Sequence, residues 1–416
     1  MRRFAPSLLV AYFLSISAQA APAKKEIVVG ASLPLSGGEA RAGNLLREGY
    51  DLAFEQANRA GGLRVGARRF PVRLLLLDDQ NDTKKGAELT QKLLEQDRVD
   101  LLLGSYSGNV VDSQSAVAEK ARVPYVTSGG AAASIYRNGR RFLFSVLAPI
   151  DSLSAALMRW IDDEQVAGRL PSPMRLAIAG ENTLHGKEFA AGIREFVAKT
   201  KGRRGSYTIV LDDSFDLDAK DFRPLLSRVG AANADALLVD AHLSDFIKMH
   251  KQYVAAGLCH KVLSYGARGS EKQAAEALPP GSTDYILSAI WWNSQLGSKG
   301  LAKEFVEAFQ RKYGRLPDWY QALSYEATRA LFAAVEAAGT LEGDAVRQKL
   351  AEMKMDSILP GGLLRFPAEY GQQSRYLFVV QQNLPGAGSP IIYPKIAAIR
   401  EGVAANPHCS ASSAKR

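Results

Sequence analysis

Short apolar runs alternate with amphipathic helical patterns along the first third of the chain. The runs at 26–35, 72–77 and 101–103 contain too few polar residues for half-exposed strands and suit buried, central parallel strands. Between them, residues 46–57 and 84–96 carry apolar side chains at helical spacing. This alternation predicts an α/β domain built on a doubly wound parallel sheet.

A second series with the same order begins after residue 149. We expect strands at 176–179, 206–211, 236–239 and 261–265, separated by helices at 187–199, 219–229 and 245–256. The runs at 141–149 and 285–290 are expected to cross between the two series. The sequence therefore predicts two similar lobes, with a cleft between them for a ligand and a hinge in the crossing segments.

Two loops rich in glycine and hydroxyl side chains follow neighbouring predicted strands of the first lobe. They are 104–108 (GSYSG) and 127–131 (TSGGA). Small molecules bind outside the carboxyl ends of the strands in an open parallel sheet. The first loop also opens a helix, whose free amides favour an anion such as a carboxylate. The pair predicts a ligand cleft, and the alternative interpretation is two ordinary turns.

The N-terminus has the pattern of a secretory signal peptide over residues 1–20. A positive start at Arg2 and Arg3 precedes a mostly apolar run to residue 17, and Ala18-Gln19-Ala20 is a small-x-small cleavage site. The alternative is a membrane anchor, but the run is too short to span a bilayer. We expect a periplasmic protein that is soluble once the signal is removed.

Composition and charge are those of a folded globular protein of 416 residues, with 47% hydrophobic and 23% charged residues and a net charge of +9. The basic residues are scattered and form no stripe with aromatics, so a nucleic-acid partner is not expected.

Cys259 and Cys409 are the two cysteines of the chain. In an oxidising compartment they could pair, but spacing alone leaves this open.

The sequence lacks the common signatures of catalysis, metal binding and nucleotide binding. It has no G-x-S-x-G elbow, Walker loop, G-x-G-x-x-G after a strand or H-E-x-x-H motif. Its five histidines do not form a compact metal-binding spacing. We therefore expect neither an enzyme nor a metal or cofactor, although an exported hydrolase remains the weaker alternative.

Several segments resemble one family in their order and spacing. They are VVGASLPLSG at 28–37, ANRAGG at 57–62, DDQND at 78–82, residues 99–107, FQRKYGRLP at 309–317 and VEAAG at 335–339. Together they resemble periplasmic substrate-binding proteins of the branched-chain amino acid ABC transporters, the leucine-binding-protein-like type. The resemblance covers almost all of the mature chain. It implies two Rossmann-like lobes joined by three crossovers, the type I periplasmic binding protein fold.

The resemblance also implies lobe boundaries and a function. The first lobe would comprise 21–148 and 290–355, the second 149–289 and 356–402, with a flexible tail at 403–416. The protein would be a monomer that closes by a hinge on a branched-chain amino acid or related carboxylate and delivers it to an ABC permease in the inner membrane. The alternative is a periplasmic sensor of the same fold that acts on a separate membrane partner.

The family's ligand positions carry over to the loops at the strand ends. The loop that takes the ligand carboxylate matches Tyr106, Ser107 and Gly108, with Gly108 where members often have a serine. The next loop matches Ser128, Gly129, Gly130 and Ala131, with Ala131 where a threonine can occur. In the second lobe, the aromatic before a glycine matches His185, and a loop tyrosine matches His242. Trp291 or Trp292 could line the cleft or pack between the lobes.

One position departs from the family in its charge. The acidic partner of the ligand ammonium falls near Arg268. An arginine cannot attract an ammonium and suits a second carboxylate or another acceptor. If Arg268 faces the cleft, an aliphatic or aromatic carboxylate, an acidic compound or an amide is favoured over a leucine-like amino acid. The alternative is that the match is shifted and Arg268 points to solvent.

Overall fold

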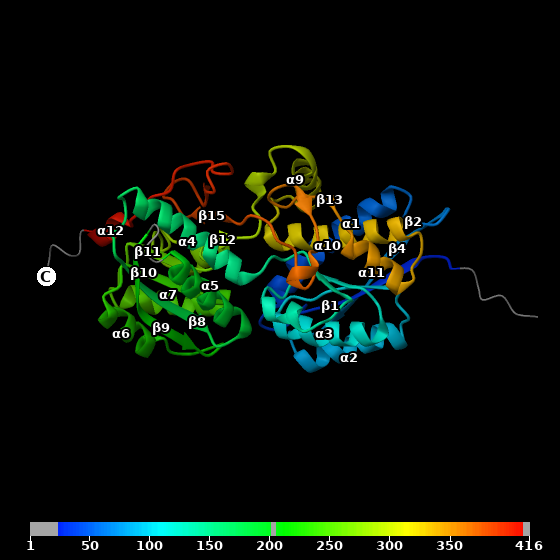
Figure 1. The fold of residues 1–416 in the computed structure, drawn as a ribbon, viewed down its shortest axis with the longest axis horizontal. Coiled ribbons are helices and arrows are strands. Elements are labelled where there is room, and N and C mark those ends of the chain that lie inside the picture. Colours follow the sequence, from blue (N-terminus) through cyan, green and yellow to red (C-terminus); the bar gives the residue numbers. More distant parts are fainter. Residues whose placement is uncertain (1–23, 201–204, 411–416) are drawn as a thin grey trace, which may run out of the picture.

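The chain folds into two α/β lobes that lie side by side (Figure 1). The computed structural model describes residues 24–200 and 205–410. The predicted signal peptide at 1–20 lies outside the described residues. Each lobe has its own mostly parallel sheet between layers of helices, as the strand–helix alternation predicts.

The first lobe contains a five-stranded parallel sheet in the order β4-β1-β5-β6-β7. The strands are β1 (Ile27–Leu33), β4 (Val72–Asp78), β5 (Leu101–Leu103), β6 (Tyr125–Thr127) and β7 (Leu143–Ser145), with a separate hairpin of β2 (Leu63–Val65) and β3 (Arg68–Phe70). The prediction that 72–77 is a central strand is wrong. β4 is an edge strand, and Leu74 to Leu77 are only half-buried. The prediction failed because an apolar run indicates a strand but does not tell which strands lie beside it.

Helices cover both faces of the first sheet. On one face, α1 packs against α10, and on the other α2 packs against α3 (Figure 1). The bounds are α1 (Ala40–Arg59), α2 (Thr83–Glu95), α3 (Gly108–Ala121), η1 (Ala133–Arg137), α9 (Gly300–Tyr313), α10 (Trp319–Ala338) and α11 (Gly343–Ala351). Helices α9 to α11 therefore return to this lobe from late in the chain.

The second lobe contains a seven-stranded sheet in the order β16-β15-β12-β11-β10-β8-β9. Its strands are β8 (Met174–Glu181), β9 (Tyr207–Phe215), β10 (Ala236–Asp240), β11 (Val262–Tyr265), β12 (Leu287–Ile290), β15 (Val379–Gln382) and β16 (Ile391–Tyr393). β15 runs antiparallel to β12 and β16. The covering helices are α4 (Ile150–Val166), α5 (Leu184–Thr200), α6 (Arg223–Ala232), α7 (Leu243–Ala255) and α8 (Lys272–Ala277).

The chain crosses between the lobes after β7, after β12 and before β15, which gives the three crossovers of the type I fold. Apolar residues from both lobes and from these crossings form one continuous buried cluster that includes Trp291 and Trp292. Smaller clusters lie under α6 to α8 and under α2 and α3. The three crossing segments are therefore packed on a common core.

The lobe boundaries expected from the sequence stay a prediction, and one segment makes contacts that bear on them. Residues 357–374, expected in the second lobe, lie against the first: Ser374 N donates to Ser145 O at 2.8 Å, and Phe366 packs on Phe144 with ring centroids 5.4 Å apart. This segment follows β13 (Met355–Asp356) and contains β14 (Leu363–Leu364) and η3 (Ala368–Tyr370). Strands of two residues leave no periodic signal in the sequence.

The tail differs from the expected flexible segment over residues 403–410. Cys259 and Cys409 form a disulfide, which settles the pairing that spacing left open. Val403 N donates to Gln382 Oε1 at 2.7 Å, and Asn406 N donates to Lys261 O at 2.8 Å. The tail ends in α12 (Pro407–Ser410). The disulfide and the two backbone hydrogen bonds attach it to residues of the second lobe that are far from it in sequence.

Candidate functional site

A cavity of about 210 Å3 lies between the lobes, at the carboxyl ends of the strands of both sheets. All ten residues predicted from the sequence line it: Tyr106, Ser107, Gly108, Ser128, Gly129, Gly130, Ala131, His185, His242 and Arg268. The other lining residues are Asn81, Thr83, Asn109, Ala132, Leu147, Thr183, Leu184, Leu217, Asp240, Ala241, Ala267, Trp291 and Trp319. The structure thus brings the predicted set together in one place.

A buried polar network holds the loop after β5 in place. Asp79 is fully buried and accepts hydrogen bonds from Ser105 Oγ at 2.8 Å and Ser32 Oγ at 3.2 Å. Ser105 N donates to the hydroxyl of Tyr125 at 3.0 Å. Burial raises the pKa of Asp79 above its ordinary value, against the effect of these bonds. Ser105 therefore supports the loop from below, and its neighbours 106–108 face the cavity.

The loops after β5 and β6 are joined directly. Gly130 N donates to Tyr106 O at 2.9 Å, and the hydroxyl of Tyr136 donates to Gly130 O at 2.8 Å. A Cβ atom at Gly129 would lie 2.2 Å from the carbonyl oxygens of Ser105 and Tyr106. Glycine is thus required at 129 by the close approach of the two loops.

The N-terminus of α3 opens into the cavity. Ser107 is its N-cap residue, and its side chain makes no capping hydrogen bond, so the first amides of the helix are left without that partner. Ser107, Gly108 and Asn109 all line the cavity. The helix dipole and these amides favour a negatively charged group here, as predicted.

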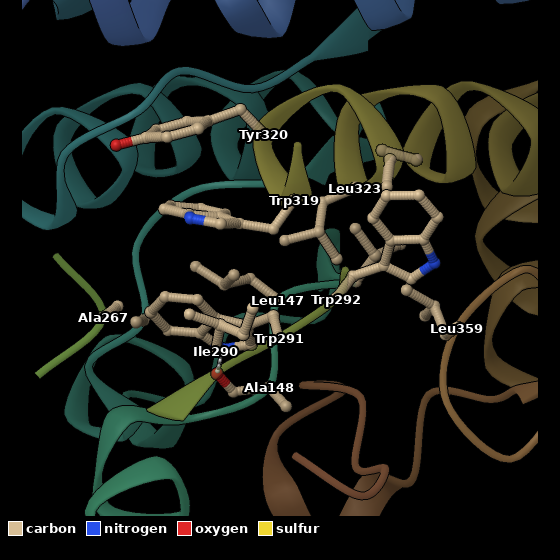
Figure 2. Close-up of a cluster of buried hydrophobic side chains, with 14 of the residues drawn as sticks. Leu147, Ala148, Ala267, Ile290, Trp291, Trp292, Trp319, Tyr320, Leu323 and Leu359 are labelled. Carbon is tan, nitrogen blue, oxygen red and sulfur yellow. Dashed lines mark hydrogen bonds between the residues drawn. The ribbon is translucent and has the colours of Figure 1, made fainter. Parts of the chain in front are cut away.

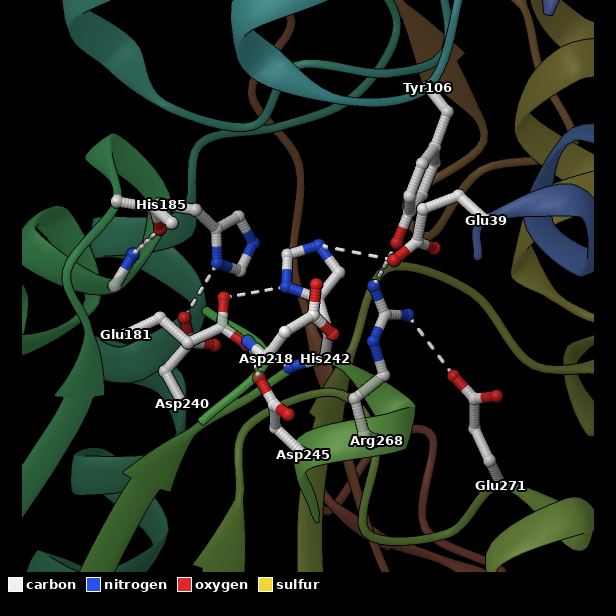
Figure 3. Close-up of polar contacts among 12 residues, drawn as sticks. Glu39, Tyr106, Glu181, His185, Asp218, Asp240, His242, Asp245, Arg268 and Glu271 are labelled. Carbon is white, nitrogen blue, oxygen red and sulfur yellow. Dashed lines mark hydrogen bonds and ion pairs between the residues drawn. The ribbon is translucent and has the colours of Figure 1, made fainter. Parts of the chain in front are cut away.

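The second lobe places two histidines on the side of the cavity opposite the N-terminus of α3, and each is held by a buried carboxylate (Figure 3). His185 at the start of α5 has its Nδ1 2.7 Å from Asp240 Oδ2, at the end of β10. His242 has its Nδ1 2.6 Å from Glu181 Oε2, at the end of β8. Each pair fixes the orientation of an imidazole at the cavity wall. The Nε2 of His242 lies 4.0 Å from Glu39 Oε1, so a second carboxylate, from the first lobe, faces that ring.

The carboxylates control the charge of this face. Burial alone would lower the pKa of His242, but Glu181 and Glu39 outweigh it and raise the pKa to about 9. Burial likewise opposes ionisation of Asp240, but the nearby His185 holds its pKa below the ordinary value. His242 is therefore an imidazolium at neutral pH, and Asp240 is a carboxylate.

Arg268, in the loop after β11, is buried with 7% of its surface exposed. Its guanidinium donates to the hydroxyls of Tyr106 and Tyr320, both at 2.6 Å, and to Glu271 Oε1 at 3.1 Å. It also lies over the ring of Trp319, 5.2 Å from the centroid. Arg268 lines the cavity and does not point to solvent, and it joins the second lobe to two tyrosines of the first.

Two indoles form the apolar wall of the cavity. Trp291, in the crossing after β12, and Trp319, at the start of α10, have ring centroids 4.8 Å apart, and Leu147 lies beside them (Figure 2). Trp292 lies outside the lining, and its indole N–H donates to Ile358 O at 3.0 Å. Of the two candidate tryptophans, Trp291 lines the cleft and Trp292 packs in the core.

Sequence reasoning missed Asp240, Trp319 and Leu147 among the lining residues. Asp240 lies at the carboxyl end of a strand of the second lobe, as the predicted loops do in the first lobe. The rule that ligands bind at strand ends could therefore have identified it from the sequence. Trp319 and Leu147 reach the cavity from segments 172 residues apart in the chain, counting from 147 to 319, and no local pattern relates them. Their placement depends on the tertiary fold.

Polar contacts also cross directly between the lobes. Ser134 N, in η1 of the first lobe, donates to Glu188 Oε1, in α5 of the second, at 2.9 Å, and Ala133 N donates to the same carboxylate. Arg41, in α1, forms an ion pair with Glu271 at 2.7 Å. These contacts close the cleft around the cavity.

Comparison with known proteins decides the family. The family model described as periplasmic binding protein matches residues 26–388. The chain belongs to this family. It is 26% identical over 330 residues to the Leu/Ile/Val-binding protein homolog 8 of Brucella abortus, covering 77% of this chain and 79% of that protein. The family is one of exported solute-binding proteins, not of enzymes.

Solved structures share the fold of this periplasmic binding protein. A branched-chain amino acid transporter substrate-binding protein from Streptococcus pneumoniae, in complex with isoleucine, superposes with a TM-score of 0.76 at 19% identity, covering 89% of this chain and all (100%) of that one. A solute-binding protein of an ABC transporter from R. palustris, in complex with benzoate, gives 0.74 at 22% identity, covering 91% and 99%. They establish the leucine-binding-protein-like type I fold.

Within residues 24–200 and 205–410, no helix is long and apolar enough to cross a membrane. The same residues contain no group of three or more His, Cys, Asp or Glu placed to hold a metal ion.

Proposed function

We propose that this protein is the solute-binding component of an ABC transporter, exported by the N-terminal segment 1–20, that captures a branched-chain-type amino acid or related small carboxylate. The observation that carries the proposal is the cavity between the lobes, with the open N-terminus of α3 on one side and the histidines and Arg268 on the other. Relatives with this fold bind isoleucine or benzoate, so the fold accommodates small carboxylates of both kinds.

The geometry supports the following mechanism. A carboxylate binds first to the amides of the loop at 106–109 on the first lobe, because these donors belong to one rigid element. Closure then brings His185, His242 and Arg268 of the second lobe onto the ligand, and Glu188 and Arg268 form their contacts across the lobes. The closed form docks on the permease in the membrane, which opens the cleft and accepts the solute.

The proposal is tested by thermal unfolding of the mature chain 21–416, refolded to remove bound solute. Amino acids, aliphatic and aromatic carboxylates and amides are screened. A ligand at a hundred times its dissociation constant stabilises the folded state by about 2.7 kcal/mol, which shifts the melting temperature visibly. Stabilisation by a carboxylate or amino acid supports the proposal. A folded chain that responds to none of them contradicts it.

A further inference from the structure

The second-lobe end of the cavity is lined mainly by hydrogen-bond donors and cations. His185, His242 and Arg268 line this end, and Asp240 is the one carboxylate among the described lining residues. Asp240 is 3% exposed, with one oxygen 2.7 Å from His185 Nδ1. A ligand ammonium at this end would therefore lie next to cations, and the one carboxylate in the lining already has a partner.

The carboxylates behind this wall already have cationic partners from the chain. Glu181 lies 2.6 Å from His242 Nδ1, and Glu271 lies 3.1 Å from Arg268 and 2.7 Å from Arg41. A buried carboxylate that has such a partner gains little from a second cation, which would also lose its own hydration. Glu39, the N-cap residue of α1, faces the same wall with its Oε1 4.0 Å from His242 Nε2. Each of these three carboxylates thus has a cationic partner from the chain before a ligand arrives.

Arg268 is held firmly in its corner of the cavity. It donates to Tyr106 of the first lobe and to Glu271 (Figure 3). It also donates to Tyr320 of the first lobe, and its guanidinium faces the indole of Trp319. Swinging it away would break charge-assisted bonds to three buried partners. The cation at this corner belongs to the protein and stays in place.

The rest of the cavity suits an apolar acid. The N-terminus of α3 provides for one carboxylate, and Trp291, Trp319 and Leu147 provide flat and aliphatic surface for an uncharged body. A ligand with these two parts satisfies the first-lobe loops and the indole wall and brings no further charge to the cationic face.

We propose that the cleft selects a carboxylate with an apolar body and no α-ammonium group, and that Arg268 takes the place of the ligand's own cation. The inference rests on the proposed function, since it specifies the solute class of the same site. It excludes leucine-like amino acids as the preferred solute and favours their deaminated counterparts.

Matched pairs of acids test the inference. Calorimetric titration of the refolded chain 21–416 compares 4-methylpentanoate with leucine, and 3-phenylpropanoate with phenylalanine, because each pair differs in the α-amino group alone. We expect the amine-free acid to bind at least tenfold more tightly in a pair that binds.

Equal or tighter binding of the amino acid overturns the inference and leaves the proposed function standing. Binding of neither member of either pair, by a folded chain, overturns the inference in this form. A response to no acid or amino acid in the wider screen removes the proposed function too.

Substitution of Arg268 tests its role directly. Arg268→Ala removes the guanidinium and leaves Glu271 with Arg41 as its remaining cationic partner, so the tenfold preference for the amine-free acid should fall at least severalfold or reverse. Arg268→Gln, which keeps a hydrogen-bond donor, serves as a second variant if the first folds poorly. Lys272→Ala is the matched control, since this exposed cation pairs with Glu276 at 3.4 Å outside the cavity. An unchanged preference in a folded Arg268 variant overturns the assignment.

Discussion

At the scale of single residues, His242 shows how a buried partner sets the charge of the cleft. Its ring would be mostly neutral at pH 7 in isolation, and the carboxylate of Glu181 makes it an imidazolium by raising its pKa to about 9. The ring stacks edge-on against Tyr106 of the other lobe, with centroids 6.4 Å apart. The charge therefore sits at the contact between the lobes.

The first prediction concerns the pH dependence of stability. Because the folded-state pKa of His242 lies above its ordinary value of 6.5, its contribution is fully present below about pH 6.5 and is lost as the pH rises toward 9. Each pKa unit corresponds to about 1.4 kcal/mol, so the loss amounts to a few kcal/mol. Urea unfolding of the unligated protein between pH 6 and 10 measures this loss.

His242→Gln should flatten this part of the profile, whereas the control His408→Gln, at an exposed residue of the tail, should not. A wild-type profile without this loss refutes the assignment.

A second prediction concerns Gly129, where the two ligand loops approach most closely. Gly129→Ala places a Cβ 2.2 Å from two backbone oxygens, so the loops must separate. Overpacking of this kind costs about 1–3 kcal/mol of stability, and we expect at least tenfold weaker binding. Gly38→Ala is the control, because a Cβ there meets nothing within 4 Å. Equal melting temperatures and affinities for the two variants would count against the loop geometry.

The residues of the site were predictable where strand ends and loop chemistry decide them. Ser107 and Gly129 follow short apolar strands, so the sheet rule places them at one edge. The family resemblance supplied His185, His242 and Arg268. Neither source could show that Arg268 is bound by two tyrosines, because the side chains come from segments 162 and 52 residues away.

At the scale of elements, periodicity predicted most helices and strands within a few residues. The long helix α10 begins at Trp319, because Asp318 and Gln321 form a capping box at its N-terminus. The strand order was not predictable in the same way, and β4 was misplaced as a central strand. Hydrophobic runs indicate a strand, and only tertiary pairing gives its neighbours.

The C-terminal tail provides the third prediction. The Cys259–Cys409 disulfide closes a loop with a sequence separation of 150 residues and fastens the tail to the second lobe. Removing such a bridge typically costs about 2–5 kcal/mol, so the Cys259→Ser/Cys409→Ser double variant should melt at a lower temperature. Reductant should lower the melting temperature of the wild type by a similar amount and leave the double variant unchanged. A wild type insensitive to reductant, with thiols that react freely, would disprove the bridge.

At the scale of the whole molecule, the two lobes are joined by contacts that neither lobe contains by itself. Glu188 accepts from backbone amides of η1 across the cleft, and it does not line the cavity. Under the proposed function, we therefore expect Glu188 to stabilise the closed form without touching the solute. The two-lobe architecture was predictable from the repeated strand–helix series, whereas these contacts were not, since they join loops to helices of the other lobe.

The fourth prediction tests closure separately from ligand contact. Glu188→Gln weakens a charge-assisted acceptor between the lobes, so affinity should fall by about threefold to tenfold through faster release, in line with a loss of roughly 1 kcal/mol. Stopped-flow and calorimetric measurements give the rate and the affinity. Glu195→Gln, on the same helix and paired with Lys199, is the matched control and should bind as the wild type does. Identical release rates for the two variants would show that Glu188 has no part in closure.

The measurement that tests the central claim most directly is calorimetric titration of the refolded chain 21–416 with the strongest ligand from the thermal screen. The account predicts saturable binding of one small carboxylate per chain, with no turnover, and at least tenfold weaker binding by Gly129→Ala. Binding that is unaffected by Gly129→Ala, a stoichiometry other than one, or slow conversion of the ligand to a product would contradict a single solute held between two closing lobes.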